Sequence, residues 1–159
     1  MDKLDLTDFF KTKTQANDFA NRLSTIAEAT YQTDFNLEKT LMDQIGIEKK
    51  DKLMALLRDN QVNIQSAATL KAFLDKLRES IATLPLVPLK LAFEPKEQTL
   101  KALTDWFMLN INKQVVFDIS IDRSLIAGAA ITYNGKFMDF SARAKFDQIV
   151  KKIIEKPIT

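Results

Sequence analysis

The first half of the chain places apolar residues at spacings of three and four, the pattern of amphipathic helices that pack on one face. Between residues 14 and 84 this pattern falls into four blocks and therefore predicts four short helices in a bundle. A further short helix is predicted over residues 4–10. The inward-facing positions predicted for the four blocks are Phe19, Leu23 and Ile26, then Leu37, Leu41 and Ile45, then Leu53, Leu56 and Leu57, and finally Leu70, Phe73, Leu74, Leu77, Ile81 and Leu84.

Residues that commonly begin or end helices flank these blocks. Thr14, Asn36 and Ser66 stand where an N-cap side chain would accept a hydrogen bond from the first turn. Gly46 stands where a left-handed residue would end the second helix, and Pro85 ends the last one.

The second half changes its period. Residues 86–93 suit a strand that begins near a proline, and Pro95 suits the first turn of a helix whose apolar face includes Leu100, Leu103 and Phe107. Residues 115–122 then alternate apolar and polar side chains, which predicts a half-buried strand.

A tight hairpin is the clearest local prediction. The dipeptide Asn134-Gly135 accepts the positive φ that both central positions of a type I′ turn require. Counting outward from that turn assigns each residue of the hairpin to one of its two faces. The second face is predicted to carry Thr132, Phe137, Ala130 and Asp139. The residue pairs predicted on the first face are Tyr133 with Lys136, Ile131 with Met138, and Ala129 with Phe140.

The chain ends in one more predicted helix, for which Ser141 is the expected N-cap. Its wide apolar stripe is interpreted first as a core face whose outer end can also dock a partner helix, and the stripe consists of Phe146, Ile149, Val150, Ile153 and Ile154. The whole chain is thus predicted as α+β, with a helical bundle over residues 1–84 and a small α/β domain over residues 85–159. The predicted order in the second domain is strand, helix, strand, hairpin, helix.

Composition narrows the possible functions. The 159 residues include no cysteine and no histidine, which removes thiolate nucleophiles, disulfides, cysteine-ligated metals and the commonest general base. Residues 85–159 carry 11 basic and 8 acidic side chains, a net charge of +3 that is small for a nucleic-acid-binding domain. No run approaches the roughly 20 apolar residues that span a bilayer. We expect a cytoplasmic protein without cofactor or metal.

Two short segments carry a resemblance to a known family. Residues 122–128 read Asp-Arg-Ser-Leu-Ile-Ala-Gly, and residues 139–143 read Asp-Phe-Ser-Ala-Arg. In order and spacing they resemble the C-terminal signature of the ATP synthase delta subunit, or oligomycin-sensitivity-conferring protein, which is Asp-Pro-Ser-Leu-Ile-Gly-Gly, a hairpin, and Asp-Gly-Ser followed by Arg. The motif residues matched here are Asp122, Ser124, Leu125, Ile126, Gly128, Asp139, Ser141 and Arg143.

The sequence departs from this signature at Arg123, Ala127 and Phe140. Since alanine does not take positive φ freely, Ala127 is expected to avoid it, while Gly128 keeps that freedom. The resemblance covers residues 86–150. The family's opening Tyr-Ala-x-Ala-Leu motif is missing, so the family's six-helix N-terminal domain is expected in an abbreviated form.

The resemblance implies a peripheral-stalk, or stator, subunit without catalytic residues that resists rotation in a rotary F-type ATP synthase. Its implied partners are the N-terminal tails of the alpha subunits of the catalytic head, bound by the helical half, and the C-terminal end of the b-subunit stalk. It would lie on the cytoplasmic face of the plasma membrane as part of the complex, without inserting into the bilayer. Phe19 and Leu23 are candidate partner-binding residues, together with the C-terminal stripe.

Other interpretations use some of the same residues. Asp122, Ser124, Asp139, Ser141 and Arg143 could form a polar active site, although Asp122 and Ser141 have structural duties at a strand end and a helix cap. A carboxylate-pair enzyme is therefore one alternative. The order strand, helix, strand, hairpin, helix and the net charge of +3 in residues 85–159 suggest another, a small RNA-binding α/β module on a helical adaptor. The sequence contains neither a phosphate-binding glycine loop nor the Gly-x-x-Gly clamp of an RNA-binding module, so no such motif supports either alternative.

Overall fold

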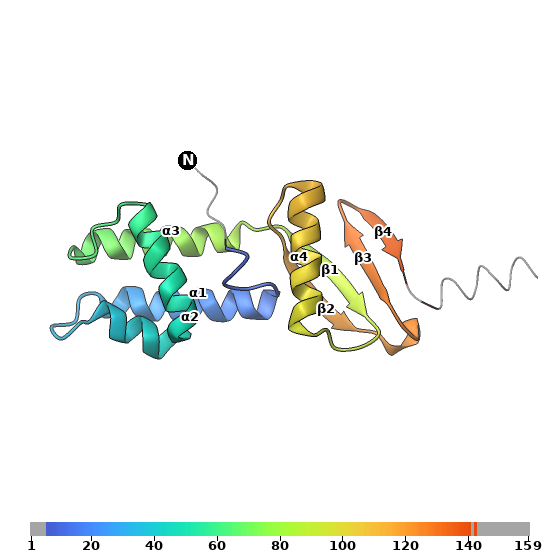
Figure 1. The fold of residues 1–159 in the computed structure, drawn as a ribbon, viewed down its shortest axis with the longest axis horizontal. Coiled ribbons are helices and arrows are strands. Elements are labelled where there is room, and N and C mark those ends of the chain that lie inside the picture. Colours follow the sequence, from blue (N-terminus) through green and yellow to red (C-terminus); the bar gives the residue numbers. More distant parts are fainter. Residues whose placement is uncertain (1–5, 141, 143–159) are drawn as a thin grey trace, which may run out of the picture. The chain divides into compact units, whose positions relative to one another are not determined.

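The computed structural model describes residues 6–140 and residue 142, and these residues form two compact units (Figure 1). One unit comprises residues 6–10 and 14–84, and the other comprises residues 11–13 together with the described residues from 85 onward. The first is helical and the second combines helix and sheet, so the predicted α+β class is confirmed.

Three helices build the helical unit: α1 (Lys13–Ala29), α2 (Leu37–Asp59) and α3 (Ala67–Ala82). The predicted caps of α2 and α3 are present, since Asn36 accepts a hydrogen bond from the Lys39 amide at 3.0 Å and Ser66 accepts one from the Thr69 amide at 3.3 Å. Most predicted inward positions are buried, namely Phe19, Leu23, Ile26, Leu41, Leu53, Leu57, Leu70, Leu74, Leu77 and Ile81.

Gly46 has the positive φ predicted for it and lies at a kink where two helical segments of α2 meet, so the predicted break after the second helical block is present within α2. Its φ of 76° and ψ of 168° are not helical, whereas the residues on both sides of it are helical. Nothing lies within 4 Å of the position that a Cβ would occupy. The glycine is therefore needed for its backbone angle and not for close packing.

The short helix predicted at the start of the chain is a turn in its described part. The Phe9 amide donates to the Leu6 carbonyl at 3.0 Å, and residues 7–9 form the turn. Both phenylalanines of this segment pack on α1, with ring centroids 4.9 Å (Phe9) and 5.9 Å (Phe10) from the Phe19 ring. Burial of the two rings accounts for the compact turn.

The second unit contains β1 (Leu86–Leu91), α4 (Glu97–Ile111), β2 (Val116–Ile121), the 3-10 helix η1 (Arg123–Leu125), β3 (Ala129–Tyr133) and β4 (Lys136–Asp139). The sheet order is β2-β1-β3-β4, with β1 and β2 parallel and the other pairs antiparallel. The predicted strand, helix, strand and hairpin are present. The predicted last helix lies outside the described residues.

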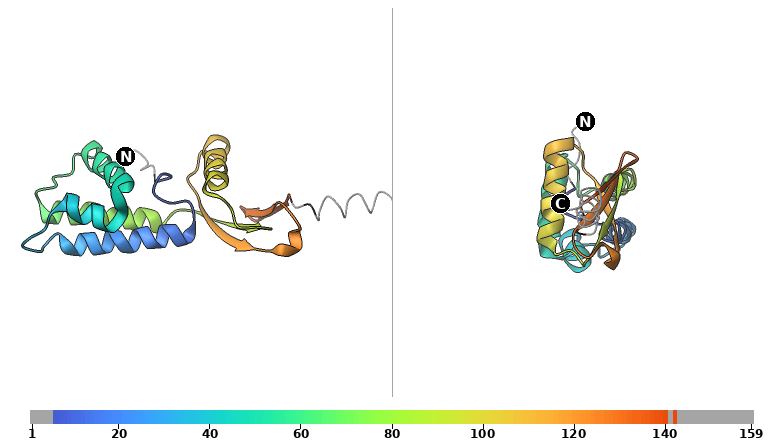
Figure 2. Two further views of the ribbon diagram at one scale, coloured as in Figure 1. Left: turned by 60° about the horizontal axis from the view of Figure 1, so that its bottom comes forward. Right: turned by 90° about the vertical axis from the view of Figure 1, so that its right-hand side faces the viewer.

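Helix α4 covers one face of this sheet (Figure 2). Alternate residues of β1 point to that face and are buried, while the residues between them are exposed. Phe107 lies at the centre, with its ring 5.6 Å from Phe117 and 5.4 Å from Tyr133. The buried cluster consists of Val87, Leu89, Leu91, Leu100, Phe107, Val115 and Phe117.

The hairpin between β3 and β4 has the predicted turn and register. Asn134 and Gly135 both have positive φ, 49° and 73°. Ile131 lies opposite Met138, Tyr133 lies opposite Lys136, and the Phe140 amide donates to the Ala129 carbonyl at 2.8 Å.

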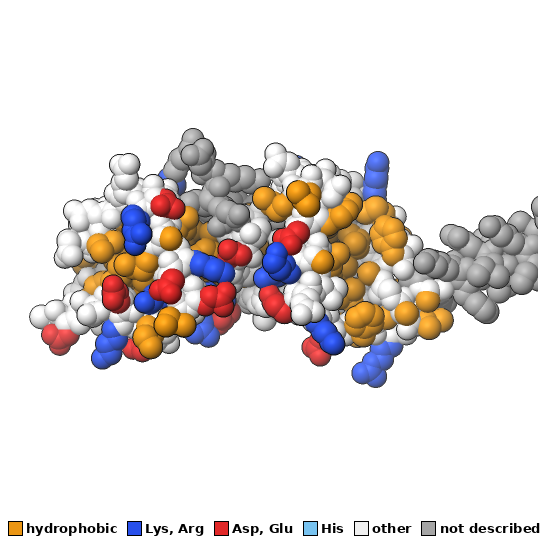
Figure 3. Space-filling view, viewed as in Figure 1, with side chains coloured by type: hydrophobic (Ala, Val, Ile, Leu, Met, Phe, Trp, Pro, Cys, Tyr) orange, Lys and Arg blue, Asp and Glu red, His pale blue; other side chains and the backbone are white. Residues whose placement is uncertain are grey.

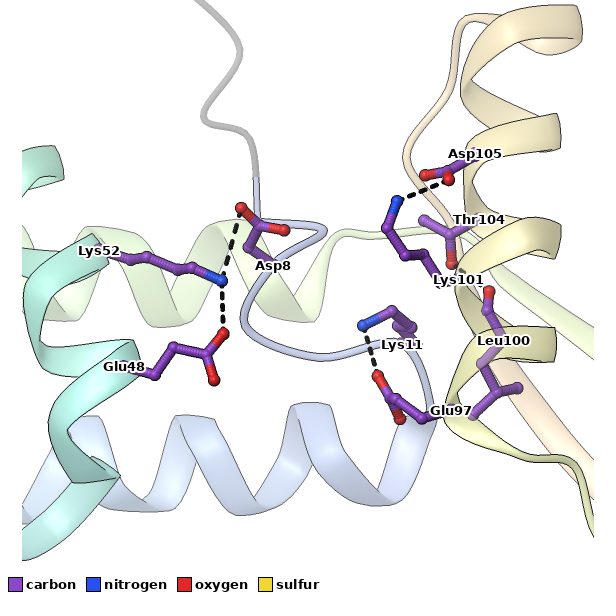
Figure 4. Close-up of polar contacts among 9 residues, drawn as sticks. All are labelled: Asp8, Lys11, Glu48, Lys52, Glu97, Leu100, Lys101, Thr104 and Asp105. Carbon is purple, nitrogen blue, oxygen red and sulfur yellow. Dashed lines mark hydrogen bonds and ion pairs between the residues drawn. The ribbon is translucent and has the colours of Figure 1, made fainter.

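Residues 11–13 extend the sheet beyond β2, which no periodicity in the sequence predicted. Thr12 forms a parallel bridge with Phe117, whose amide donates to the Lys11 carbonyl at 2.9 Å. The ammonium of Lys11 lies 2.7 Å from the Glu97 carboxylate (Figure 4), and that of Lys13 lies 2.9 Å from Asp118. A three-residue segment is too short to show an alternating pattern.

We predict that replacing residues 11–13 by three glycines exposes the Phe117 amide to solvent exchange. The variant loses both ion pairs and adds backbone entropy to the unpaired segment, so hydrogen exchange at Phe117 should rise by about tenfold or more. The Val116 amide is the internal control, because it donates to Pro85 at 2.9 Å and should keep its protection. Equal protection of Phe117 in both proteins would contradict the pairing.

Candidate functional site

The loop that follows β2 contains most of the family-like residues, and its polar side chains bond to each other. The Asp122 amide donates to the Leu91 carbonyl at 2.8 Å, which closes the end of the sheet. The Asp122 carboxylate accepts hydrogen bonds from the Ser124 amide at 3.0 Å and the Ser124 hydroxyl at 2.6 Å. Asp122 is thereby the N-cap of η1. Asp122 directly follows the last residue of β2, which fits the strand-end position expected of it, whereas η1 and its cap were not predicted.

The same loop contains a tight turn that sequence reasoning missed. Ile126 has a φ of 66° and a ψ of −54°, and the Ala127 amide donates to the Leu125 carbonyl at 2.7 Å. This is a three-residue γ-turn with positive φ at its centre, a rare geometry that is costly for a β-branched residue. Gly128 has a φ of 92°, as its permissive position predicted, and Ala127 avoids positive φ.

The strained isoleucine is also exposed. Ile126 keeps 70% of its surface accessible, whereas its neighbour Leu125 is buried. An isoleucine leaves no sequence signal for positive φ, which explains why this turn was not predicted. A strained, exposed apolar residue within the motif segment is a candidate contact for another molecule.

The remaining polar motif residues are distributed along the hairpin and beyond it. Asp139 ends β4 and lies opposite Ala130 in the register. Ser141 and Arg143 lie outside the described residues. Of the polar cluster considered as an active site, the structure therefore brings Asp122 and Ser124 together, as a helix cap.

An apolar strip remains exposed on the face of the sheet that α4 covers. Figure 3 shows hydrophobic side chains gathered over β3 and β4 beside α4. We define the apolar strip as Ile121, Ile131, Met138 and Phe140, which the strand register places on the same face as Leu89 and Leu91. Phe140 is 58% exposed, Ile121 45% and Met138 36%, while Ile131 packs partly against the core.

A second exposed apolar surface, formed by two residues, lies on the outer side of α4. Leu109 is 84% exposed and Trp106 is 51% exposed, with the Trp106 ring packed edge-on against Phe107 at 5.3 Å. The two residues are three apart and therefore neighbours on the helix surface. Trp106 lies at the rim of the core, and half of its surface is available to a partner.

In the helical unit, the candidate partner-binding residues Phe19 and Leu23 are both buried in the core. Leu23 is fully covered, so the structure offers it no exposed surface. Phe19 in addition lines a pocket of 330 Å³ between α1 and the kink of α2. The ammonium of Lys49 lies 5.8 Å from the centre of the Phe19 ring, and Met42, 56% exposed, stands at the rim.

The shifted pKa values of the described residues belong to ion pairs on helix surfaces. A hydrogen bond from Lys71 lowers the pKa of Asp75 and raises the pKa of Lys71 itself. A hydrogen bond from Lys52 to Glu48 raises the pKa of Lys52, and Asp8 adds to the effect (Figure 4). These pairs lie on the helical unit, apart in sequence from the motif loop.

Two general features of the described chain bear on its chemistry. No cluster of three or more acidic side chains that could hold a metal ion is found in residues 6–140. Among the described helices, none combines the length and apolar character needed to cross a bilayer.

Comparison with known proteins gives matches to the C-terminal region. The family model described as "ATP synthase delta (OSCP) subunit" matches residues 86–153. ATP synthase subunit delta of Thermosipho africanus is 37% identical over 68 residues, and that of Thermotoga maritima is 32% identical over 68 residues. Each alignment covers 43% of this chain and 37% of the relative, so the chain matches little more than a third of the length of these relatives.

Among solved structures, a chain of the cryo-EM structure of the Toxoplasma gondii mitochondrial ATP synthase hexamer is similar, with a TM-score of 0.42 and 12% identity. The alignment covers 91% of this chain and 86% of that chain.

We predict that Ile126→Gly is more stable than Ile126→Ala by about 1 kcal/mol. Both changes remove the exposed side chain, but alanine keeps a Cβ that clashes at positive φ. Urea unfolding of the two variants measures the difference. Met42, an exposed position within α2, is the control, because there the alanine variant should be the more stable by a similar amount. An alanine variant at least as stable as the glycine variant at position 126 would contradict the γ-turn.

Proposed function

We propose, on the premise that residues 86–153 belong to the ATP synthase delta (OSCP) subunit family, that this chain is a non-catalytic peripheral-stalk subunit of a rotary F-type ATP synthase. The family match confirms the resemblance that the motif segments predicted, and it is the observation that carries the proposal. In this function the chain links the catalytic head to the b-subunit stalk and resists rotation while the rotor turns. It acts on the cytoplasmic face of the membrane as part of the complex and does not insert into the bilayer.

The proposed function requires surfaces that can bind other proteins. A connector needs exposed apolar anchors on well-supported helices, with polar surroundings that keep the free chain in solution. Both units offer such anchors. We assign one partner to each unit, so that the two contacts can form at the same time.

The C-terminal unit is proposed to bind the C-terminal end of the b-subunit stalk through the outer side of α4. Trp106 and Leu109 form an exposed apolar pair on a helix whose opposite side is fixed in the core by Leu100 and Phe107. A stalk helix could pack along this pair with anchors at helical spacing. Exposed Ile126 is a further candidate contact from the motif loop, and the outer end of the stripe formed by Phe146, Ile149, Val150, Ile153 and Ile154 is another.

The helical unit is proposed to bind the N-terminal tails of the alpha subunits at the pocket beside the α2 kink. Its floor is the Phe19 ring, its rim includes the exposed Met42, and its charged residues Asp18, Arg22 and Lys49 are of both signs. A pocket of 330 Å³ accommodates one or two large apolar side chains of an amphipathic helix. Leu23 does not line this pocket and is fully buried in the core of the same unit.

We predict that one substitution in each unit separates the two contacts. Leu109→Glu should weaken binding of a peptide from the C-terminal end of the b subunit by about tenfold or more, because a charge replaces an apolar anchor. Met42→Glu should weaken binding of an alpha N-terminal peptide to a similar extent. Both residues are exposed, so neither change should unfold the chain. Isothermal titration calorimetry of the unsubstituted chain and both variants with the two peptides measures all six affinities.

Each variant is the control for the other. Leu109→Glu should bind the alpha peptide as the unsubstituted chain does, and Met42→Glu should bind the b peptide unchanged. If the unsubstituted chain binds neither peptide at micromolar concentration, the stator function is wrong. If both peptides bind but neither variant weakens its partner, the function stands and the assigned surfaces are wrong.

A further inference from the structure

The pocket between α1 and the kink of α2 is lined by charged residues that are unevenly paired. Four charged side chains line it, those of Asp18, Arg22, Asp43 and Lys49. Asp18 and Arg22 neutralise each other at 2.7 Å, and Arg22 also donates to the Gln44 carbonyl. Asp43 and Lys49 form no ion pair with any residue that the structure describes. The pocket therefore offers an incoming molecule one positive and one negative charge.

The acidic residues closest to Lys49 belong to another lysine. Glu48 lies 2.9 Å from the Lys52 ammonium, which also lies 3.7 Å from Asp8 (Figure 4). The Lys49 ammonium lies instead 5.8 Å from the centre of the Phe19 ring, within the range of a cation–π contact. Lys49 is thus held at the pocket by an aromatic ring, and its charge is available to a carboxylate of another molecule.

The place of Lys49 links its charge to the apolar part of the pocket. Phe19 forms the floor, and Met42 at the rim is 56% exposed. Lys49 is half-buried, as is typical of a lysine whose stem contacts apolar groups while its ammonium stays near water. A helix that inserts an apolar side chain here brings the residue three or four positions away to the edge of the pocket. A carboxylate at that edge is attracted by the Lys49 ammonium, and a second ammonium is repelled.

We infer that Lys49 determines specificity in the helical unit, and that its pocket selects an amphipathic helix of another protein with an acidic side chain one turn from the apolar anchor. The inference rests on the proposed function in one respect, since it states the chemistry that an alpha-subunit tail needs at this pocket. Asp43 is exposed and is the other unpaired charge, so selection of a basic helix at Asp43 is the opposite outcome. Charge pairs of this kind discriminate between partners more than they raise affinity.

Three designed helical peptides test the inference with the full chain. They share two leucine anchors and differ at one position, four residues from an anchor, which is glutamate, glutamine or lysine. At low salt, fluorescence anisotropy should show binding of the glutamate peptide about threefold tighter than that of the glutamine peptide, and binding of the lysine peptide about threefold weaker. These differences should shrink at about 1 M salt, because salt screens the ion pair.

Substitutions at Lys49 should change this order. In Lys49→Glu the glutamate peptide should bind most weakly, and in Lys49→Met, which keeps an apolar stem, the glutamate and glutamine peptides should bind alike. Lys39→Glu is the matched control, because Lys39 is an exposed lysine of α2 outside the pocket and the net charge changes equally. It should leave the order unchanged. Met42→Glu should weaken all three peptides, which locates them at the pocket. Circular dichroism checks that each variant is folded.

Four results would overturn the inference. They are equal binding of the three peptides to the unsubstituted chain, no binding of any peptide, an order that Lys39→Glu inverts as Lys49→Glu does, and tightest binding of the lysine peptide, which would identify Asp43 as the selecting charge.

Failure of the proposed function gives a different result. An alpha N-terminal peptide that does not bind, while the glutamate peptide keeps its preference through Lys49, contradicts the alpha-tail assignment and leaves the selection rule intact. An alpha peptide that binds while the three designed peptides bind alike contradicts the selection rule alone.

Discussion

The burial of one face of β1 under α4 is the constraint on which the C-terminal unit depends. Val87, Leu89 and Leu91 are buried, while Leu86, Pro88 and Lys90 between them are exposed, so the sheet has one apolar side and one solvated side. Because β1 pairs with β2 on one side and β3 on the other, this alternation fixes the register of both neighbours. The hairpin, the motif loop and the N-terminal bridge to β2 are all positioned by strands that β1 holds in register.

Because α4 packs on one face of the sheet, its position also determines which apolar side chains stay exposed to a partner. Helix α4 is fixed by Leu100 and Phe107 against the sheet, which leaves Trp106 and Leu109 on its outer side. The strip that includes Met138 and Phe140 is a different exposed surface, on the face of the sheet that α4 partly covers. Asp122 and Ser124 of the motif loop stabilise the start of η1, and Ile126 is an apolar residue of this loop that is directed to solvent.

Sequence patterns predicted the elements that local chemistry determines. Asn134-Gly135 specified the hairpin and its register, and Asn36 and Ser66 specified two helix starts, because each effect acts within a few residues. Patterns did not predict the parallel pairing of β1 with β2 or the bridge from Thr12 to Phe117, which join residues far apart in the chain. The γ-turn at Ile126 was missed because its residue type argues against it, whereas Gly46 correctly indicated the break within α2 because positive φ favours glycine. Of the candidate site, sequence identified the motif loop and placed Leu23 at an inward-facing position, but the exposure of Leu109 depends on tertiary packing.

The central claim is that one chain joins the catalytic head and the stalk at the same time, through separate units. The most direct measurement is mass photometry of the full chain mixed with catalytic head and with a soluble b-subunit fragment large enough to register as added mass. We expect a ternary species whose mass equals the sum of head, chain and b fragment, and no species that combines head and b fragment when the chain is omitted. If the two partners displace each other from the chain, or if only one of them binds, the claim is contradicted.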